Sequence, residues 1–216
     1  MKLNQLSVTE IKRLSKTYCK HRVNLISHFS CYKKEEPQRV LFLDIEITPA
    51  LGWTWQKYET DIIEFEKQWR VLCVGYKWQG GKTEIVWGNE RKVIKKIRDL
   101  LDEADLAIGH NSDKFDLKKI NTRIAYYNLK PPSKYKTLDT LKMAKKYWGM
   151  LSNKLNDIGI YMNLGKKIET GGFKLWKDCM AGNKKSWKLM TDYCKQDVDL
   201  LEKLYLKLLP WLPQKK

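Results

Sequence analysis

The sequence predicts an α/β domain with a mixed β-sheet and a helical C-terminal half. Two observations support this class. Short apolar runs typical of buried strands alternate with amphipathic helical patterns as far as residue 139, and only helical patterns follow from residue 140 onward. The 216 residues, of which 43% are hydrophobic, are enough to bury a full core, so intrinsic disorder is excluded as the overall class.

Strands are predicted where short apolar runs are bounded by turn residues. The first run is apolar except for two acids and ends before Pro49. The second and third runs are separated by Gln-Gly-Gly-Lys, a turn sequence, and therefore form a hairpin. The last run is expected at an edge of the sheet. The five predicted strands are residues 40–46, 70–78, 83–87, 106–109 and 135–138.

Helices are predicted where apolar residues recur with a helical period. In the clearest case, the residues expected to face inward are Val93, Ile94, Ile97, Leu100 and Leu101. A Pro-Pro pair closes the helix that follows. The predicted helices are residues 7–18, 90–103, 114–127, about 140–148, 153–161, 173–180 and 185–208.

The chain is strongly basic, with a net charge of +17 at pH 7. Both ends carry the surplus: residues 1–39 have a net charge of +6 and residues 142–216 of +9, around a middle segment of +2. Such a surplus indicates a polyanionic partner, either nucleic acid or an anionic membrane surface. This distribution of charge fits a catalytic centre of carboxylates flanked by surfaces that bind phosphates. It fits equally well a basic surface that only keeps the protein soluble.

Several features indicate a cytoplasmic protein. No apolar run approaches the ~18 residues that a membrane span needs. The first 18 residues have no apolar region of the kind found in signal peptides. The five cysteines are an odd number and are scattered, which is typical of a reducing compartment. Cys73, Cys179 and Cys194 are interpreted as packed thiols.

Two acids stand inside the first predicted strand, in Asp44-Ile45-Glu46. Side chains two residues apart on a strand share one face, so both carboxylates point the same way. Buried carboxylates are very costly without a partner, so a cation is expected between them. A divalent metal and an arginine both satisfy this requirement.

Two later segments add to this pair. Asp116 follows a short buried strand and the residues His110 and Asn111. Tyr193 and Asp197 lie four residues apart in the last predicted helix, which places both on one helical face. Together with Asp44 and Glu46 this makes four carboxylates and a tyrosine, a set that suits two-metal phosphoryl chemistry.

These segments resemble the three motifs of the DEDD superfamily of 3′–5′ exonucleases, in its tyrosine-containing DEDDy branch. Exo I is matched by Leu43-Asp44-Ile45-Glu46, Exo II by His110-Asn111-x-x-x-Phe115-Asp116 and Exo III by Tyr193-x-x-x-Asp197. Residues 137–140 and 154–159 are also similar to the exonuclease domains of family B DNA polymerases. The resemblance covers about residues 38–208, extends to free-standing phage and bacterial predicted exonucleases, and implies an RNase H-like fold.

The resemblance implies a role for each residue of these motifs. Asp44, Glu46, Asp116 and Asp197 would hold two Mg²⁺ or Mn²⁺ ions, and Tyr193 would orient the attacking water. The expected activity is 3′–5′ hydrolysis of single-stranded or frayed DNA to 5′-nucleotides. An RNase D-like exoribonuclease and an inactive nucleic-acid-binding module stay open as alternatives. A separate polymerase or replication factor is an expected partner, and a phage-encoded protein would act in the host cytoplasm.

Residues near the motifs provide further candidates. Asp139 is expected to be a surface or capping acid, although among the acids near the motifs it is the strongest candidate for a substitute metal ligand. A structural role in the Exo II turn is expected for His110. The residues expected to contact the substrate are Asn111, Trp53, Trp55, Lys166 and Lys167. Tryptophan rings can stack on a base at a 3′ end, and packing of the loop on the sheet explains Trp53 and Trp55 equally well.

An N-terminal segment, residues 1–38, is expected to precede the exonuclease domain at 39–210. It carries the pattern Cys19-x-His21-x6-His28-x2-Cys31, four potential zinc ligands in thirteen residues. A structural Zn²⁺ ion would fold a segment that has no clear core of its own. Two small buried cysteines and two surface histidines would give the same pattern, so both interpretations stay open.

Overall fold

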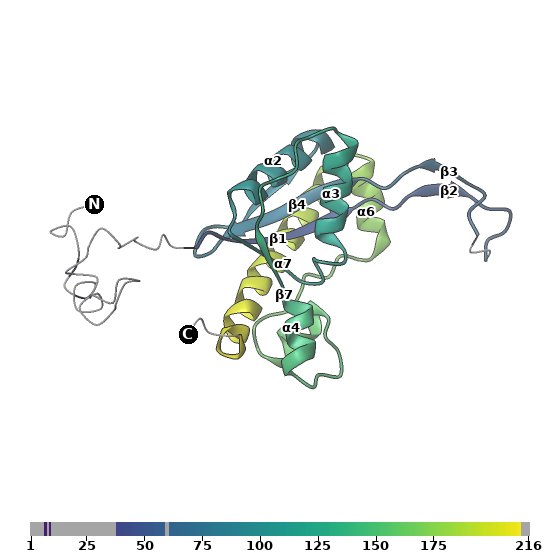
Figure 1. Cartoon of the computed structure of the whole chain (residues 1–216). Coiled ribbons are helices and arrows are strands. Elements are labelled where there is room, and N and C mark those ends of the chain that lie inside the picture. Colours follow the sequence, from purple (N-terminus) through teal and green to yellow (C-terminus); the bar gives the residue numbers. More distant parts are fainter. Residues whose placement is uncertain (1–6, 8, 10–37, 59–60, 213–216) are drawn as a thin grey trace. The chain divides into compact units, whose positions relative to one another are not determined.

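The computed structural model describes residues 7, 9, 38–58 and 61–212, which are coloured in Figure 1. The expected zinc cluster of Cys19, His21, His28 and Cys31 lies outside these residues, as does nearly all of the expected N-terminal helix. Both stay predictions, and so does the domain boundary near residue 38. The chain from Gln38 onward forms one compact unit.

A mixed sheet of five strands forms the centre of this unit, as the sequence predicted. Its order is β5-β4-β1-β6-β7. Strand β1 runs antiparallel to β4 and parallel to β6. Strands β4 and β5 form the predicted hairpin, and β6 pairs in parallel with the edge strand β7. The strands are β1 (Val40–Ile47), β4 (Val71–Trp78), β5 (Glu84–Trp87), β6 (Leu106–Gly109) and β7 (Lys136–Asp139).

A second, two-stranded sheet was not predicted. Strands β2 (Leu51–Trp53) and β3 (Glu64–Lys67) pair antiparallel in a ribbon that leaves the ends of β1 and β4 and projects from the body (Figure 1). Every residue of the two strands is exposed except Gly52, which is half-buried. Phe65 alternates with Glu64 and Glu66, but Leu51-Gly52-Trp53 does not alternate and the surrounding segment has no clear periodicity, so the pair was not recognised from the sequence.

The helices match the predicted ones to within two residues at either end. Two of them begin at asparagine caps: Asn89 accepts a hydrogen bond from the Lys92 backbone, and Asn183 from Lys185 and Ser186. No helix in the described ranges is long and apolar enough to cross a membrane. The helices are α2 (Glu90–Glu103), α3 (Asp116–Tyr126), α4 (Thr140–Tyr147), α5 (Leu155–Tyr161), α6 (Phe173–Met180) and α7 (Lys184–Leu208), followed by a 3₁₀ turn at Leu209–Trp211.

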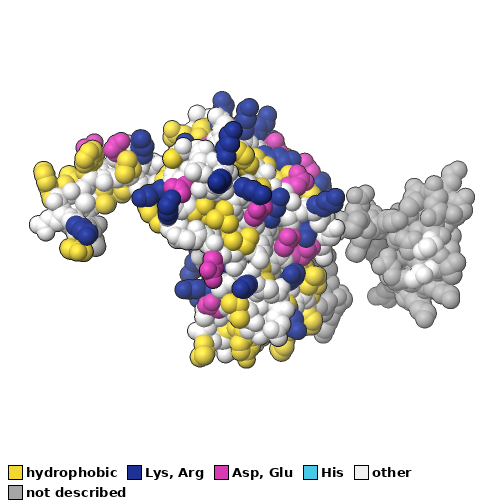
Figure 2. Space-filling view, turned by 180° about the vertical axis from the view of Figure 1, so that it is seen from behind, with side chains coloured by type: hydrophobic (Ala, Val, Ile, Leu, Met, Phe, Trp, Pro, Cys, Tyr) yellow, Lys and Arg dark blue, Asp and Glu magenta, His cyan; other side chains and the backbone are white. Residues whose placement is uncertain are grey.

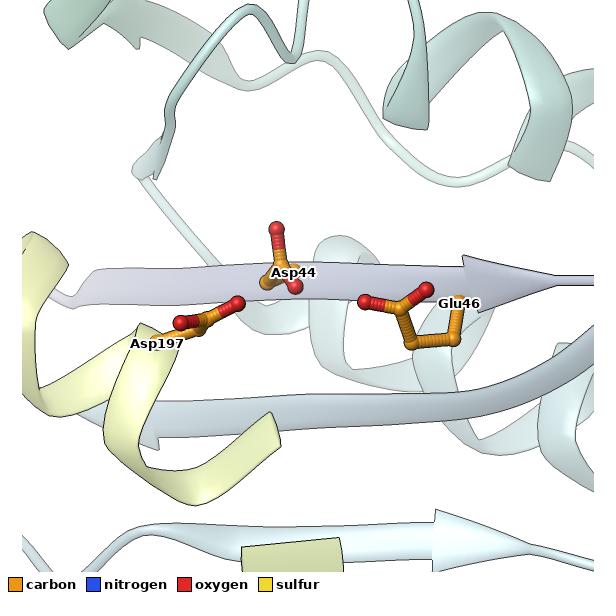
Figure 3. A group of neighbouring side chains, drawn as sticks. All are labelled: Asp44, Glu46 and Asp197. Atoms are coloured by element: carbon orange, nitrogen blue, oxygen red, sulfur yellow. The ribbon is translucent and has the colours of Figure 1, made fainter. Parts of the chain in front are cut away.

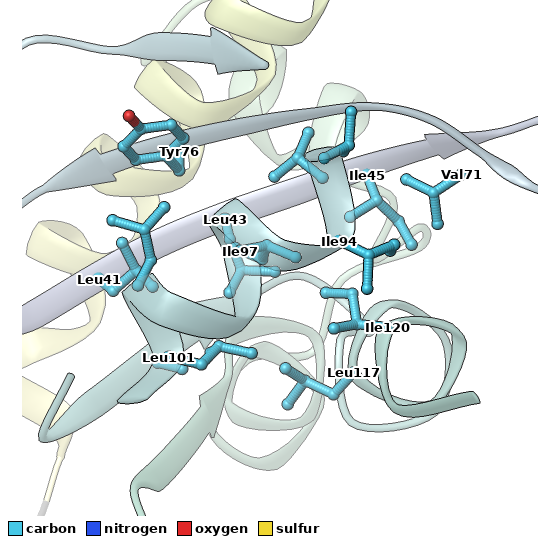
Figure 4. Packing of buried hydrophobic residues seen from close by; sticks show 14 of the residues in the cluster. Leu41, Leu43, Ile45, Val71, Tyr76, Ile94, Ile97, Leu101, Leu117 and Ile120 are labelled. Carbon is cyan, nitrogen blue, oxygen red and sulfur yellow. The ribbon is translucent and has the colours of Figure 1, made fainter. Parts of the chain in front are cut away.

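Alternate residues of β1 face two different cores. Leu41, Leu43 and Ile45 pack with α2 and α3 in the larger core, which is drawn in Figure 4. Phe42 points the other way and packs against Val198 of α7. Because the side-chain period of a strand is two, Asp44 and Glu46 share the face of Phe42 and are directed towards α7.

Candidate active site

Asp44 and Glu46 of β1 meet Asp197 of α7. One carboxylate oxygen from each of the three residues lies within 4.8 Å of the other two. Figure 3 shows the two acids of the strand side by side, with Asp197 reaching them from the helix. The predicted pair therefore shares one face of β1, and the acid of the third motif joins it.

A close approach of α7 to the sheet makes this meeting possible. Gly75 of β4 pairs with Asp44 of β1. A Cβ atom at Gly75 would lie 3.0 Å from Cγ2 of Val198 and 3.1 Å from the carbonyl oxygen of Cys194, both on α7. The missing side chain at Gly75 lets the turn of α7 that carries Asp197 lie directly over the strands.

Asp116, the first residue of α3, lies beside this group but outside it. It is buried, and its Oδ1 atom accepts a hydrogen bond from the backbone N–H of Ile45 at 3.1 Å. After burial, the charge of Asp116 is the largest cause that raises the pKa of Asp44. The structure therefore places the acid of the second motif close to Asp44, with one oxygen committed to the backbone.

Crowding and burial disfavour the charged forms of these acids. Burial, followed by the neighbouring carboxylates, raises the pKa of Asp44 well above its usual range. Burial, the charge of Asp197 and other neighbours raise the pKa of Glu46 to about 7, and burial raises that of Asp116 to about 6. A cation bound between the carboxylates would reverse these shifts.

The donor set fits a divalent metal ion. Oδ1 of Asp197 is buried and has no hydrogen-bond partner in the part of the chain that the structure describes. Such an orphaned acceptor is costly unless a ligand satisfies it. Hard cations such as Mg²⁺ and Mn²⁺ prefer carboxylate oxygens, which Asp44, Glu46 and Asp197 supply.

Lys167 places a positive charge inside the acidic group. Its Nζ atom lies 2.6 Å from Oδ2 of Asp197 and 3.1 Å from the hydroxyl oxygen of Tyr193. Burial lowers the pKa of Lys167, but Asp197, Asp44 and Glu46 outweigh this effect, and the net shift is upward. The sequence predicted that Lys167 contacts the substrate, which stays a prediction. The ion pair with Asp197 was missed because no regular spacing links a loop lysine to a residue thirty positions later.

Tyr193 lies one helical turn before Asp197, as its spacing predicted. Its hydroxyl group accepts a hydrogen bond from Nζ of Lys167, which also bonds Oδ2 of Asp197. Burial, followed by the charges of Asp197, Glu46 and Asp44, raises the pKa of Tyr193 above its ordinary value. The phenol therefore stays protonated at neutral pH and acts as a hydrogen-bonding group, not as a base.

A cavity of about 560 Å³ opens beside Asp44 and is lined in part by Asn111, Leu141 and Asn156. Ligand sites for small molecules commonly have this size. Asn111 adopts a left-handed backbone conformation with φ of 65°, which asparagine tolerates better than most residues. The cavity offers amide groups and an apolar wall within reach of the carboxylates.

His110 has the structural role that the sequence predicted. Its Nδ1 lies 2.9 Å from Oγ1 of Thr140, and its Nε2 lies 2.9 Å from the carbonyl oxygen of Asn153. Both ring nitrogens are therefore engaged within the protein. Burial lowers the pKa of His110, so the ring is neutral at neutral pH.

Asp139 is a capping residue, and the structure does not support it as a substitute metal ligand. Its Oδ1 accepts hydrogen bonds from the backbone N–H groups of Leu141 at 3.0 Å and Asn111 at 2.9 Å. It caps α4 and at the same time ties down the turn before α3. A surface or capping role was the favoured expectation for this acid, and the structure shows the cap.

The remaining substrate-contact candidates lie apart from the cavity beside Asp44. Trp53 and Trp55 are 63% and 82% exposed, in or just after strand β2. Neither tryptophan lines the cavity beside Asp44. Lys166, the third candidate, borders a second cavity, which lies beside Tyr193, and neither tryptophan lines that cavity. Substrate contact by Trp53, Trp55 and Lys166 stays a prediction.

The interpretation of three cysteines as packed thiols is confirmed: Cys73, Cys179 and Cys194 are buried free thiols.

The raised pKa values predict how pH and metal act on stability. Folded Glu46, with a pKa of about 7, keeps a proton that the unfolded chain releases near its ordinary value of 4.5. The metal-free protein should therefore lose stability as the pH rises between these values, and a bound divalent ion should offset that loss. Melting temperatures with EDTA or Mg²⁺ at pH about 5 and about 8 test this, and the Mg²⁺ shift should be larger at the higher pH.

The variant Glu46→Gln is the control for this measurement. It keeps the shape of the side chain and removes its titration, so the fall in stability between the two pH values should become smaller. Equal Mg²⁺ shifts at both pH values, or a Glu46→Gln protein with the same pH dependence as wild type, would contradict the assignment of a cation site to this cluster.

Comparisons with known proteins agree with this geometry. The sequence model of the RNase H superfamily matches residues 41–209. No curated protein sequence matches the chain. Among solved structures, the family B DNA polymerase from the hyperthermophilic archaeon Pyrobaculum calidifontis is similar, with a TM-score of 0.62 and 18% identity. The match covers 83% of this chain and 26% of the polymerase chain, so only about a quarter of that protein is represented here.

Proposed function

The chain belongs to the RNase H superfamily, and we propose that it is a metal-dependent 3′–5′ exonuclease of the DEDDy type. Its proposed substrate is single-stranded or frayed DNA, and its products are 5′-nucleotides. One observation carries the proposal: Asp44, Glu46 and Asp197 converge within 4.8 Å, and Nζ of Lys167 links Oδ2 of Asp197 to the hydroxyl group of Tyr193. These are the acids and the tyrosine of the first and third motifs; Asp116 of the second motif lies beside them and stays a predicted ligand.

The side chains of the site would have different roles in phosphodiester hydrolysis. Asp44, Glu46 and Asp197 would hold two Mg²⁺ or Mn²⁺ ions, with Asp116 beside them. Bound divalent ions supply activation of water and stabilisation of the charge that develops on the phosphate. Tyr193, held protonated, donates a hydrogen bond that orients the attacking water. Lys167 adds a fixed positive charge next to Asp197.

The surroundings of the site suit a polyanionic strand. Lys145, Lys154 and Lys167 line the cavity beside Asp44, and Lys166 borders the neighbouring cavity. Lysine side chains attract phosphates over a distance of about one Debye length. The amide groups of Asn111 and Asn156, inside the first cavity, are placed to hydrogen-bond the sugar or base of a terminal nucleotide.

Digestion of labelled strands tests the polarity of the reaction. A 5′-labelled single strand should give a descending ladder with Mg²⁺ or Mn²⁺ and no products with EDTA, because the carboxylates act through bound ions. Blocking the 3′ terminus should protect the strand. Cleavage of a circular single strand, or release of label from the 5′ end first, would contradict the proposed direction.

The same assay separates DNA from RNA as substrate. Matched DNA and RNA strands of one sequence should be compared under single-turnover conditions. Faster hydrolysis of RNA would replace the proposed activity with that of an RNase D-like exoribonuclease. Binding of both strands without hydrolysis of either, in any metal, would identify an inactive nucleic-acid-binding module.

A further inference from the structure

The ribbon of β2 and β3 exposes a concentration of large apolar side chains. We call residues 49–68 the arm. Within it Trp53, Trp55, Tyr58 and Phe65 are 63%, 82%, 88% and 51% exposed. Ile62 and Leu51 are exposed as well. Large exposed apolar patches of this kind mark interaction sites in soluble proteins, and tryptophan and tyrosine are enriched among the residues that dominate binding energy.

The charge of the arm is opposite to that of the rest of the chain. Residues 49–68 contain two lysines and four acidic residues, a net charge of −2 in a chain of net charge +17. Figure 2 shows hydrophobic and acidic side chains on the arm at the left, while lysine and arginine are spread over the body. Platforms that stack nucleic-acid bases combine aromatic rings with cations, so an acidic arm favours a protein partner with a basic rim.

The body of the same chain carries a surface of that chemistry. A groove of about 480 Å³ lies between the end of α3 and the segment that leads into β7. Its walls include Ile124, Leu129, Pro131 and Tyr135. We call it the proline groove. Its volume is large enough for an indole side chain of the arm.

Three exposed lysines lie in or next to the segment that lines the proline groove, against one acid, Asp102, whose Oδ1 accepts a hydrogen bond from the backbone of Ser133. Lys134 lines the groove, Lys130 precedes its two prolines, and Lys136 begins β7. Strand β7 is an edge of the main sheet, so beside the groove one side of a strand has no partner within the described part of the sheet. The groove thus offers an apolar pocket, a basic rim and a strand edge, which match the aromatic rings, the acids and the strands of the arm.

We propose that the arm of one molecule docks into the proline groove of a second copy of this chain. Reciprocal exchange of two arms and two grooves gives a closed dimer with twofold symmetry. The contact places acidic residues such as Glu64 and Glu66 near the lysine rim, which offsets the repulsion between two strongly basic bodies. This proposal is independent of the proposed nuclease activity.

Analytical ultracentrifugation of the full chain, freed of nucleic acid by a high-salt wash, tests the proposal. The wild type should show a concentration-dependent dimer that weakens at high salt. Trp53→Ala/Trp55→Ala should raise the dimer dissociation constant by about 10²-fold or more, as expected for aromatic residues at the centre of an interface. Leu151→Ala is the matched control: Leu151 is fully exposed and lies outside the arm and the groove, so the variant should dimerise like wild type.

Charge reversal tests the pairing of the two surfaces. Glu64→Lys/Glu66→Lys in the arm and Lys130→Glu/Lys134→Glu at the groove should each weaken the homodimer. An equimolar mixture of the two variants should form a heterodimer again, because each reversed arm then meets a reversed groove. Unchanged melting temperatures of both variants would show that the losses come from the interface and not from unfolding.

Two outcomes would overturn the proposal. One is a wild type that stays monomeric at every concentration at which it is soluble. The other is a dimer that the arm variants leave intact. If the wild type is monomeric and Trp53→Ala/Trp55→Ala instead weakens binding to a labelled single strand, the arm stacks on nucleic acid and the second copy is ruled out as its partner.

Discussion

Replacing Asp44 by alanine or Asp197 by asparagine is expected to lower the rate of hydrolysis by about 10³-fold or more. Each change removes one of three carboxylates whose oxygens lie within 4.8 Å of one another, so a bound ion loses a ligand. Single-turnover rates on a labelled strand, with saturating Mg²⁺, provide the measurement. Strand binding should persist, because the lysines beside the site are untouched.

Asp199→Asn is the matched control for Asp197→Asn. Asp199 lies on the same helix, two residues further on, and pairs with Lys77 and Thr83 away from the carboxylate cluster. Its replacement should leave the rate within a fewfold of wild type. A folded Asp44→Ala or Asp197→Asn protein with a rate within about tenfold of wild type would refute the metal-dependent assignment.

Tyr193→Phe is expected to lower the rate by about 10²-fold, with little change in strand affinity or melting temperature. The substitution removes only the hydroxyl group, which accepts a hydrogen bond from Lys167, and keeps the ring that packs edge-on against Trp176.

Tyr205→Phe tests whether loss of any buried hydroxyl group on α7 has the same effect. Tyr205 packs against Phe42, in the core below the site. This variant should retain full activity. Full activity of Tyr193→Phe, with damage only in Tyr193→Ala through lost stability, would mean that Tyr193 is a packing residue and would withdraw it from the chemistry.

The sequence predicted those parts of the site that depend on local periodicity. Asp44 and Glu46 share a face because side chains alternate along a strand, and Tyr193 lies one turn before Asp197 because helical neighbours recur every three to four residues. The five strands of the main sheet and the described helices were predicted for the same reason. Each of them buries apolar side chains, which form short continuous runs in strands such as β1 that face two cores and recur with a helical period in the helices.

Features that depend on contacts between distant segments could not be predicted in this way. The ion pair of Lys167 with Asp197 joins a loop to a helix thirty residues away. Asp139 accepts backbone hydrogen bonds from the turn at Asn111, a partner that only the fold supplies. The ribbon of β2 and β3 lies in a segment without clear periodicity, so it was not recognised as a pair of strands.

The sequence by itself determined the α/β class, the order of the main-sheet strands and the helices, and the shared faces of Asp44 with Glu46 and of Tyr193 with Asp197, because these follow from side-chain periodicity within one element. Only the tertiary structure decided that Asp197 reaches Asp44, since this requires α7 to pack against Gly75 of a neighbouring strand. The same close packing brings the acids together and partly buries Asp44 and Glu46. It thereby raises the pKa of Glu46 to about 7 and creates the demand for a bound cation, an effect of burial that no spacing of residues reveals.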